Sequence, residues 1–391
     1  MLKILCLDIE GGYGGSSRSL FQSLSHISDS AIHAEVWCRR AGPVQALYAN
    51  AGIPCTITPA MPHISALPRL SRNLYVFTRA RLRFPASRRF RDVLSAAINE
   101  RFDVVHFNHE ALFLLARWLR RRTHVPFTMH VRTNLTPSAF SRWQARNIAR
   151  VIDHTVFISE NEQKSWRALG LDPARASVIY NIAGTADMAA KPHPAIPDDG
   201  RLKIASLSNY AWIRGVDRLV DVAAALAARG RHDILFVVAG NMRLGGALPG
   251  QLGAISRRGG SLADYAAAKG VADMFIFLGH VDTPERVLAG CNALARLSRE
   301  NNPWGRDAIE ALGAGRPVIA TGSYNRFVES NATGFLLPNF SADDVAEKIL
   351  QLADDRALVN RLGAVAKERI EALCDGPTRA ADLAQIWREV A

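Results

Sequence analysis

The stretch of sequence that says most about the fold is residues 298–318, which reads SRENNPWGRDAIEALGAGRPV. A short apolar run, typical of a buried strand, precedes it. Polar residues and a Pro-Trp-Gly turn then lead into a predicted helix over residues 306–314, and Gly315 and Pro317 connect that helix to another apolar strand. Strand, loop, helix and strand in this order predict a parallel α/β sheet, which binds ligands at the carboxyl ends of its strands.

The same alternation of short apolar strands and helices runs along the whole chain. Strands are expected at residues 2–8, 34–38, 55–58, 104–107, 127–130, 155–158, 202–206, 234–239, 275–278, 293–297 and 317–320. Helices are expected at residues 17–27, 43–51, 216–229, 262–269, 284–289, 306–314, 342–353 and 356–371, and within a basic region at 70–100. We therefore predict an α/β protein with two Rossmann-like, doubly wound domains that face a central cleft.

The expected domain boundaries follow from one segment that lacks this alternation. Residues 184–200 are rich in proline and alanine and are predicted to form a linker. The N-terminal domain then covers residues 1–183 and the C-terminal domain residues 201–375. A last helix over residues 376–391 is expected to pack back on the N-terminal domain.

Composition narrows the class of protein. The chain has 391 residues, 48% of them hydrophobic and 21% charged, which is ordinary for a folded protein. Its five scattered cysteines predict neither a zinc site nor a disulfide framework, so we expect a cytoplasmic protein. Residues 1–195 hold 25 Lys and Arg against 13 Asp and Glu, whereas the rest of the chain holds 23 of each. That excess suits an anionic partner, although an arginine-rich genomic composition explains it equally simply.

A glycine-rich loop follows the first predicted strand. Residues 10–17 read EGGYGGSS and lead into a helix, whose free N–H groups suit a phosphate group. Gly12, Gly14 and Gly15 are therefore candidate donor-binding residues. The spacing is not that of a dinucleotide fingerprint, and a plain tight turn remains the alternative reading.

Two charged residues of the second half are the strongest candidates for chemistry. Arg214, followed by Gly215, stands at the start of a predicted helix, where a cation and free N–H groups suit a diphosphate. Glu310 lies about one turn into the helix of residues 306–314, among alanine and isoleucine. A carboxylate in apolar surroundings is a functional-site candidate.

These motifs resemble the family 4 (group 1) glycosyltransferases of the GT-B fold. The residues that match the family signature in register are Gly305, Glu310, Ala311, Gly315, Pro317 and Val318. Further matches are residues 103–106 (DVVH), 157–160 (FISE), 178–181 (VIYN), 277–281 (FLGHV), 319–322 (IATG) and 333–336 (TGFL). The resemblance thus extends over nearly the whole chain.

The sequence departs from the family pattern at five positions. One is Ser323, which stands where the family has the second glycine of a Gly-Gly pair after the signature. Asn302 stands where the signature has its first glutamate, and Trp304 where it has phenylalanine. Asn209 takes the place of the family's phosphate-binding arginine, and Arg214 that of its lysine. Glu300, two residues before Asn302, is an alternative for the missing carboxylate. These departures concern the donor sugar more than the class of reaction.

The resemblance implies a retaining, metal-independent glycosyltransferase. Its donor would be a nucleoside-diphosphate sugar, UDP- or GDP-linked, and no other cofactor is implied. Glu310 would hold the ribose hydroxyls, Arg214 the diphosphate, and the turn of Pro303, Trp304 and Gly305 would face the sugar and phosphate. The departing phosphate would take the acceptor's proton, so no dedicated nucleophile is required. The acceptor would be a glycan or lipid-linked glycan, as in the synthesis of bacterial surface polysaccharides or glycolipids.

Several residues of the N-terminal half are candidates for the acceptor side. His106, His109 and His130 follow or end predicted strands, and we expect His109 or His130 to be catalytic, although each alone can be structural. The candidates for binding the acceptor or an anionic membrane are Arg72, Arg79, Arg81, Arg83 and Arg132. Basic and apolar residues interleave over residues 69–91, with a second basic run at 117–122, as in an interfacial helix on the inner face of the plasma membrane. A solvated surface helix is the alternative.

Two other functions stay open from the sequence. A nucleotide-sugar epimerase or hydrolase of the same fold needs no acceptor groove. A non-catalytic carbohydrate-binding protein is the second alternative. No nucleic-acid-binding motif supports a nucleic acid as the partner of the basic half.

Overall fold

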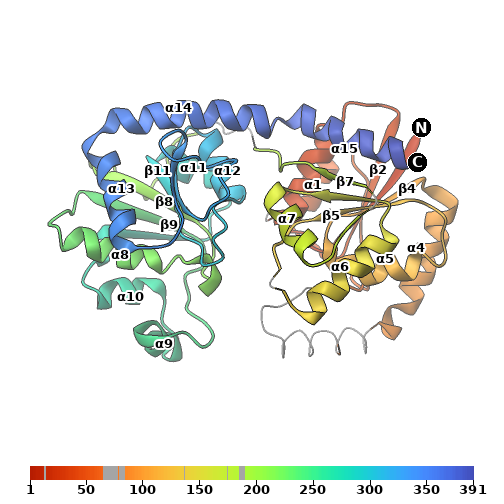
Figure 1. Cartoon of the computed structure of the whole chain (residues 1–391), viewed down its shortest axis with the longest axis horizontal. Coiled ribbons are helices and arrows are strands. Elements are labelled where there is room, and N and C mark those ends of the chain that lie inside the picture. Colours follow the sequence, from red (N-terminus) through yellow and green to blue (C-terminus); the bar gives the residue numbers. More distant parts are fainter. Residues whose placement is uncertain (13–14, 65–77, 79–83, 136, 174, 185–189) are drawn as a thin grey trace. The chain divides into compact units, whose positions relative to one another are not determined.

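The structure is a computed structural model that describes residues 1–12, 15–64, 78, 84–135, 137–173, 175–184 and 190–391 (Figure 1). Its contacts divide the chain into two compact units. Unit 1 comprises residues 1–182 and 374–391, and unit 2 comprises residues 183–373.

Unit 1 is built on a parallel sheet in the order β3-β2-β1-β4-β5-β6-β7. Its strands are β1 (Leu2–Asp8), β2 (Ile32–Cys38), β3 (Cys55–Ile57), β4 (Val104–Phe107), β5 (Phe127–Val131), β6 (His154–Phe157) and β7 (Ala176–Val178). The strand order reverses between β1 and β4, which pair through Ile4–Leu7 and Val104–Phe107. This reversal leaves a topological switch point at the carboxyl ends of the two strands.

Helices cover both faces of this sheet. They are α1 (Gly15–Ser25), α2 (Val44–Asn50), α4 (Arg88–Arg101), α5 (Phe113–Leu119), α6 (Ala139–Val151), α7 (Glu160–Ala168) and α15 (Gly376–Val390), with short turns η1 (Pro85–Ser87) and η2 (Glu110–Leu112). Because side chains alternate along a strand, β1 sends Ile4 and Cys6 into one apolar cluster with α1, α2 and α15. Leu5 and Leu7 enter the other cluster, with α4, α5, α6 and α7.

The C-terminal helix α15 belongs to unit 1. Trp387 is fully buried in the cluster that contains Ile4 and Leu20. At its start, Gly376 lies against the ring of His26, and a Cβ there would come within 2.4 Å of that ring. Near its end, Arg388 forms an ion pair with Asp29. Unit 1 is therefore made of two separate stretches of the chain.

Unit 2 repeats the doubly wound plan, with strand order β10-β9-β8-β11-β12-β13. Its strands are β8 (Leu202–Leu207), β9 (Ile234–Ala239), β10 (Phe275–Gly279), β11 (Ala293–Arg296), β12 (Val318–Thr321) and β13 (Gly334–Leu337). Its helices are α8 (Arg218–Ala227), α9 (Gly250–Arg257), α10 (Leu262–Ala268), α11 (Pro284–Ala289), α12 (Arg306–Gly313), α13 (Ala342–Asp354) and α14 (Arg356–Leu373), with turns η3 (Trp212–Arg214) and η4 (Ala272–Met274). Both units thus have the Rossmann order, and the predicted fold class of two Rossmann-like domains is confirmed.

The expected linker differs from what the structure shows. Residues 185–189 lie outside the described residues, but residues 190–200 pack on unit 2. Ile196 is 9% exposed, and the backbone N–H of His193 donates to the carbonyl of Arg286. Proline removes helical and strand periodicity without preventing burial, so the sequence pattern alone suggested a looser segment than the one observed.

Candidate functional site

In unit 2, a small pocket lies at the switch point, where β8 and β11 end. Residues that line it include Ser206, Ser208, Arg214, Gly215, Ser298 and Asp307. Its walls therefore come from the loop after β8 and from the first part of the stretch at residues 298–318.

Gly215 brings these two loops together. Its φ of 67° is in the left-handed region, and a Cβ there would lie 2.0 Å from the carbonyl oxygen of Leu297. Only glycine permits this contact. Arg214, directly before it, is exposed and donates from Nη1 to Ser208 Oγ at 2.8 Å. The remaining guanidinium N–H groups can bind an anion at the strand ends.

A buried ion pair fixes the same two loops to each other. Arg299 donates to the carboxylate of Asp217, with Nη1 2.8 Å from Oδ1, and Asp217 is 1% exposed. Arg299 also lies 3.3 Å from the ring centroid of Trp212 and donates to the carbonyl of that residue at 2.7 Å. Sequence reasoning missed this pair, because 82 residues separate its two members.

The Pro-Trp-Gly turn is held by a second arginine. Arg296, at the end of β11, pairs with Asp307 at 2.7 Å and donates from Nε to the carbonyl of Asn302 at 3.1 Å. A Cβ on Gly305 would lie 3.0 Å from the guanidinium carbon of Arg296, so the absence of a side chain lets the turn lie on the ion pair. The backbone of the turn is thus fixed independently of the Asn302 side chain.

Trp304 is a packing residue in this structure. It is 2% exposed, and its ring centroid lies 4.9 Å from that of Phe327. Pro303 is also buried. Among the described residues, Trp304 Nε1 and Asn302 Oδ1 are buried without a hydrogen-bond partner. Asn302 is the less buried of these two residues, so its amide is the better candidate for a polar ligand group.

Glu310 is half-buried on α12 and has a charged neighbour that the sequence reasoning missed. Its Oε1 lies 3.0 Å from Nη2 of Arg306, one helical turn earlier, and both side chains are 13% exposed. The spacing of four residues between Arg306 and Glu310 in a predicted helix could have indicated this ion pair. The carboxylate is therefore oriented rather than isolated among apolar residues.

The two remaining donor-side candidates have different surroundings. The side-chain oxygen of Asn209 accepts from the backbone N–H of Asn241 at 2.8 Å, so it is already engaged. Partial burial raises the pKa of the Glu300 carboxyl, and Arg296 and Arg214 lower it. Glu300 is thus the carboxylate that lies within the electrostatic reach of Arg214.

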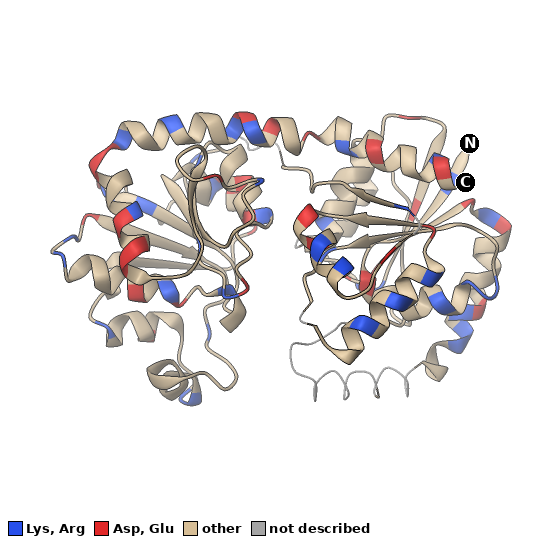
Figure 2. Ribbon diagram, in the orientation of Figure 1, with Lys and Arg blue, Asp and Glu red and all other residues tan. Residues whose placement is uncertain are grey.

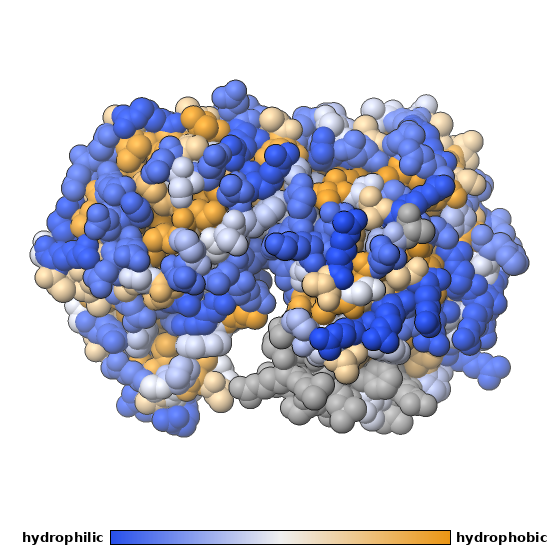
Figure 3. Space-filling model, in the orientation of Figure 1, coloured by the Kyte–Doolittle hydropathy of each residue, from blue (hydrophilic) through white to orange (hydrophobic). Residues whose placement is uncertain are grey.

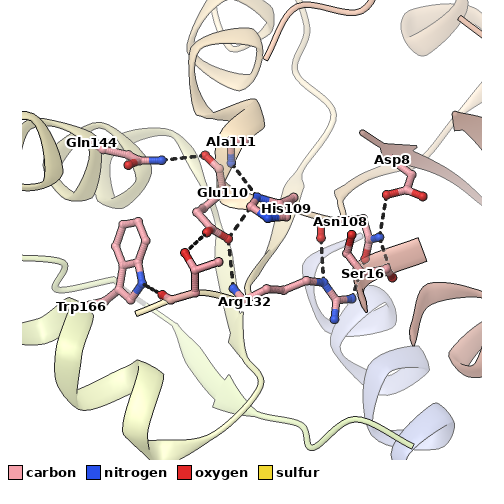
Figure 4. A network of polar contacts seen from close by, with 10 residues as sticks. Asp8, Ser16, Asn108, His109, Glu110, Ala111, Arg132, Gln144 and Trp166 are labelled. Carbon is pink, nitrogen blue, oxygen red and sulfur yellow. Dashed lines mark hydrogen bonds and ion pairs between the residues drawn. The ribbon is translucent and has the colours of Figure 1, made fainter. Parts of the chain in front are cut away.

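In unit 1, a polar network occupies the corresponding switch point (Figure 4). Asp8, at the end of β1, is fully buried and accepts from Nδ2 of Asn108 at 3.0 Å and from the hydroxyl of Ser17. Asn108 also donates to the carbonyl of Ser16 at 3.1 Å, in the first turn of α1. Burial raises the pKa of the Asp8 carboxyl, while the hydrogen bonds from Ser17 and Asn108 lower it. The network ties the start of α1 to the ends of β1 and β4.

The glycine-rich loop is built into this edge of the sheet. A Cβ on Gly11 would lie 2.1 Å from the carbonyl oxygen of Arg40, in the loop after β2. Gly15 has a φ of 47° where α1 begins, and Gly12 is exposed. Gly14 lies outside the described residues. Of the described glycines of this loop, Gly11 is buried, whereas Gly12 and Gly15 are exposed.

His109 is the histidine that lies at this edge. It is half-buried, and its Nδ1 lies 3.1 Å from the backbone nitrogen of Ala111 and 3.3 Å from Glu110 Oε2 (Figure 4). Its neighbour Glu110 is 3% exposed and accepts from the backbone N–H of Arg132 at 3.0 Å and from the hydroxyl of Thr133. His109 is therefore held in place by the loop that follows β4.

His130, predicted to be catalytic, is buried inside unit 1. It is 4% exposed, and its Nδ1 lies 2.8 Å from Nε2 of His106, which is fully buried. The other nitrogen of His106 contacts Thr128 Oγ1 at 2.8 Å and Trp387 Nε1 at 3.4 Å. Burial lowers the pKa of His106 to about 3 and that of His130 well below its usual value. The two rings form a neutral, buried pair, and a substrate contact by His130 is not what the structure shows.

Arg132 also differs from the expectation of a surface cation. Its Nε donates to the carbonyl of Asn108 at 2.8 Å and its Nη1 to Asn181 Oδ1 at 3.3 Å. It is half-buried in the network of unit 1 rather than part of a basic surface. The other four arginines predicted to bind the acceptor or a membrane lie outside the described residues; they are Arg72, Arg79, Arg81 and Arg83.

Two further observations concern only the residues that the structure describes. No three or more of their His, Cys, Asp and Glu side chains come together as a metal site would require. None of their helices has the length and apolar character needed to cross a bilayer.

Comparison with known proteins assigns both units to the class that this fold and these strand-end sites suggest. Residues 13–185 match the family described as Glycosyltransferase Family 4, and residues 190–369 match Glycosyl transferases group 1. The two matches together span most of the chain, which belongs to the family 4, group 1 glycosyltransferases. The chain is thus assigned to a class of transferases.

Two curated relatives and one solved structure illustrate the similarity. The chain is 25% identical over 260 residues to an alpha-D-kanosaminyltransferase of Streptomyces kanamyceticus, covering 64% of each protein. It is 28% identical over 266 residues to a GDP-mannose-dependent alpha-(1-6)-phosphatidylinositol monomannoside mannosyltransferase of Mycobacterium tuberculosis, covering 62% of this chain and 65% of the relative. The matches thus span slightly less than two thirds of these relatives. The structure of Anabaena HepE in complex with UDP-glucose has a TM-score of 0.76 at 19% identity, over 100% of both chains, which shows the shared fold.

The buried histidine pair leads to a prediction about pH. An unfolded histidine has a pKa of about 6.5, so the neutral His106 ring contributes stability that is complete above that pH and is lost as the pH falls toward 3. For His106 alone, the free energy of unfolding should fall by roughly 2 kcal/mol at pH 5.

Urea unfolding of wild type and His106→Gln between pH 7.5 and pH 5 should therefore show a shallower pH dependence in the variant. His280→Gln, at an exposed histidine, serves as the control and should keep the wild-type slope. Equal slopes in all three proteins would contradict the prediction.

Proposed function

We propose that this protein is a retaining, metal-independent glycosyltransferase that moves a sugar from a UDP- or GDP-linked donor to a hydroxyl of a glycan or lipid-linked glycan. The observation that carries the proposal is the carboxyl edge of the Rossmann-ordered sheet of unit 2. Arg214 lines the pocket there, and Glu310 lies on α12, the helix that follows β11. The relatives add support, since one is GDP-mannose-dependent by name and one solved structure contains UDP-glucose.

The step of the reaction that most needs stabilisation is departure of the leaving group. The bond between the anomeric carbon and the β-phosphate oxygen breaks, and the acceptor oxygen forms the new bond to that carbon. The acceptor proton moves to the departing phosphate, and a nucleoside diphosphate leaves. Negative charge develops on the phosphate, so a fixed cation and backbone N–H groups lower the barrier. Arg214 is the proposed cation, since Ser208 and the Gly215 contact hold it at the strand ends.

Glu310 is proposed to bind the ribose of the nucleotide. A carboxylate accepts hydrogen bonds from two neighbouring hydroxyls, which suits a ribose. Arg306 orients this carboxylate from the preceding turn of α12. The turn at Asn302, Pro303 and Gly305 is proposed to meet the sugar and phosphate through its backbone and the Asn302 amide, with Glu300 beside it.

Unit 1 is proposed to supply the acceptor side. His109 has a fixed ring orientation, and its Nε2 can form a hydrogen bond with a sugar hydroxyl. The start of α1, with Gly12 and Gly15, offers backbone N–H groups to an anionic group. His130 is left out of this set because it is buried against His106.

We further propose that unit 1 attaches peripherally to an anionic membrane surface. Arg142, Arg146 and Arg150 lie four residues apart on α6 and are exposed, so they share one face of the helix (Figure 2). Within the described residues, none of the three has a carboxylate at ion-pair distance. Figure 3 shows a band of strongly hydrophilic side chains over this part of unit 1. An unpaired row of guanidinium groups favours anionic lipid head groups, at about 1 kcal/mol for each residue.

The direct test is nucleotide release. The full chain is incubated with a panel of UDP- and GDP-linked sugars, with and without glycan acceptors, and the released UDP or GDP is measured. A transferase releases nucleotide faster with acceptor for one donor. Acceptor-independent conversion of the sugar would instead identify an epimerase or hydrolase, and equally slow release from every donor a binding protein.

Replacement of Glu310 tests the ribose contact. Glu310→Gln keeps the size of the side chain but removes its charge, which should raise the KM for the donor and the Kd of the nucleotide roughly 10- to 100-fold. Glu347→Gln, at an exposed position of α13, is the matched control and should change neither value. The donor-site assignment fails if Glu310→Gln leaves KM and kcat as in the wild type.

Vesicle flotation tests the basic row on α6. The triple variant Arg142→Gln, Arg146→Gln and Arg150→Gln should bind anionic vesicles much less than wild type, and the difference should shrink at high salt. The control replaces three exposed arginines of unit 2, Arg243, Arg257 and Arg258, with glutamine and should bind like wild type. Equal recovery of the wild-type protein with neutral and anionic vesicles would contradict the membrane proposal.

A further inference from the structure

Unit 2 contains a second cavity at the opposite edge of its sheet from the switch-point pocket. It has a volume of about 540 Å³. We call it the amino-edge cavity; its polar wall includes Arg201, Lys203, Asn292, Arg316, Arg356 and Asn360. Four of these residues stand where β8, β11 and β12 begin, and two lie on the first turns of α14.

The cavity is separate from the proposed donor site. The switch-point pocket is lined by residues at the carboxyl ends of β8 and β11, such as Ser208 and Ser298. The amino-edge cavity is lined by Lys203 and Asn292, at the other ends of the same strands. A strand of six residues spans roughly 20 Å, so no small ligand contacts both places at once.

The wall of the cavity carries an excess of positive charge. Four of its residues are cationic, and Asp198 is the acidic residue of the described lining. Lys203 is only 7% exposed, and its Nζ lies 3.2 Å from Asp199 Oδ1. Arg201 binds the other oxygen of the same carboxylate at 2.7 Å. The carboxylate of Asp199 thus pairs with Lys203 and Arg201, and the other two cations of the wall have no share in it.

Arg316 and Arg356 are those two cations, and they donate to backbone carbonyls instead of carboxylates. Arg316 donates to Leu288 at 3.1 Å and Arg356 to Gly200 at 3.1 Å. Neither guanidinium has a carboxylate at ion-pair distance among the described residues. Asp233 lies near enough for Arg356 to lower its pKa, but that carboxylate is bound mainly by Arg231.

The one thiol in the wall does not supply a counter-charge. Cys291 is buried, and burial raises the pKa of its thiol to about 12, so the group stays neutral. Burial also lowers the pKa of the Arg316 guanidinium, as expected of a cation that lacks an opposite charge. A half-buried guanidinium without a counter-ion is costly unless an anion completes it.

We propose that the amino-edge cavity binds a phosphorylated small molecule, whose phosphate group lies between Arg316 and Arg356. Guanidinium groups match phosphate oxygens in geometry, and two unpaired cations balance a phosphate dianion better than a single carboxylate. The volume is that of a small-molecule site rather than of a bare ion. The remainder of the ligand would meet Asn292, Asn360 and the apolar side chain of Val359. This binding site does not depend on the proposed transfer reaction.

Asn360 provides a test that removes no contact of the folded protein. It is exposed, lines the cavity, and lies one helical turn after Arg356 on α14. Asn360→Glu brings a negative charge to the cavity, and Asn360→Lys a positive one. Ala357→Glu places the same negative charge on the same helix, at an exposed position outside the lining. A pair of charges several ångströms apart near a surface changes affinity roughly 3- to 10-fold.

The experiment uses the full chain carrying Arg214→Gln, so that the proposed donor site is weakened. Calorimetric titration with inorganic pyrophosphate and with glucose 1-phosphate measures the Kd for each Asn360 variant. Asn360→Glu should weaken binding about 3- to 10-fold, Asn360→Lys should strengthen it by a similar factor, and Ala357→Glu should leave it within about twofold.

The outcomes separate the possible ligands and the two sites. Tighter binding of glucose 1-phosphate than of pyrophosphate supports a phosphorylated small molecule, whereas a Kd that ignores the charge at position 360 overturns the proposal. Absence of measurable binding by the Arg214→Gln chain also overturns it. In the chain with Arg214 intact, the Asn360 variants should keep the wild-type KM for the nucleotide-sugar donor, so failure here is independent of failure at the donor site.

Discussion

The backbone contact between Gly215 and Leu297 is the constraint on which the site of unit 2 depends. A switch point is open because the helices after β8 and β11 leave on opposite faces of the sheet, so nothing covers the strand ends. The loop before α8 closes part of this gap by bringing Gly215 against the last carbonyl of the β11 segment. The ion pair of Arg299 and Asp217 then holds the two loops at this distance. Together they place Arg214, which is exposed, beside an uncovered strand end.

Arginines that donate to backbone carbonyls recur at the carboxyl edges of both units. Arg132 binds the carbonyl of Asn108 in unit 1, and in unit 2 Arg218 binds that of Leu297 and Arg296 that of Asn302. A loop at a strand end has carbonyls without ladder partners, and a guanidinium satisfies them without a helix or strand. Part of the high arginine content therefore serves the loops. An arginine in the first half of the chain is therefore not, by itself, evidence for a membrane-binding surface. For this reason the proposal of membrane attachment rests on the exposed row of arginines along α6.

The sequence was sufficient for the fold, because the doubly wound plan follows from the alternation of apolar strands and helices. The place of Glu310 on its helix likewise follows from the signature around it. The sequence was insufficient to predict contacts between residues far apart in the chain, or roles that depend on whether a side chain is buried. Nothing local distinguishes His109, held at an open edge, from His130, which is buried against His106. His106 in turn contacts Trp387, from far along the chain. Helix α9 also went unpredicted, because the glycines near it mask its short apolar pattern. The partner of Glu310, by contrast, was within reach, since Arg306 precedes it by one turn.

The structure explains how the turn of residues 302–305 accommodates Asn302 where the family signature has a glutamate. The turn of residues 302–305 is fixed by the Asn302 carbonyl on Arg296, by Gly305 over the Arg296–Asp307 pair, and by Trp304 on Phe327. None of these contacts uses the side chain at position 302, so its replacement leaves the turn in place. What changes is the group offered to a ligand, from a charged acceptor to a neutral amide that both donates and accepts. Because Glu300 supplies a carboxylate whose pKa Arg214 lowers, the proposed donor site keeps a negative charge beside Arg214 although position 302 is neutral.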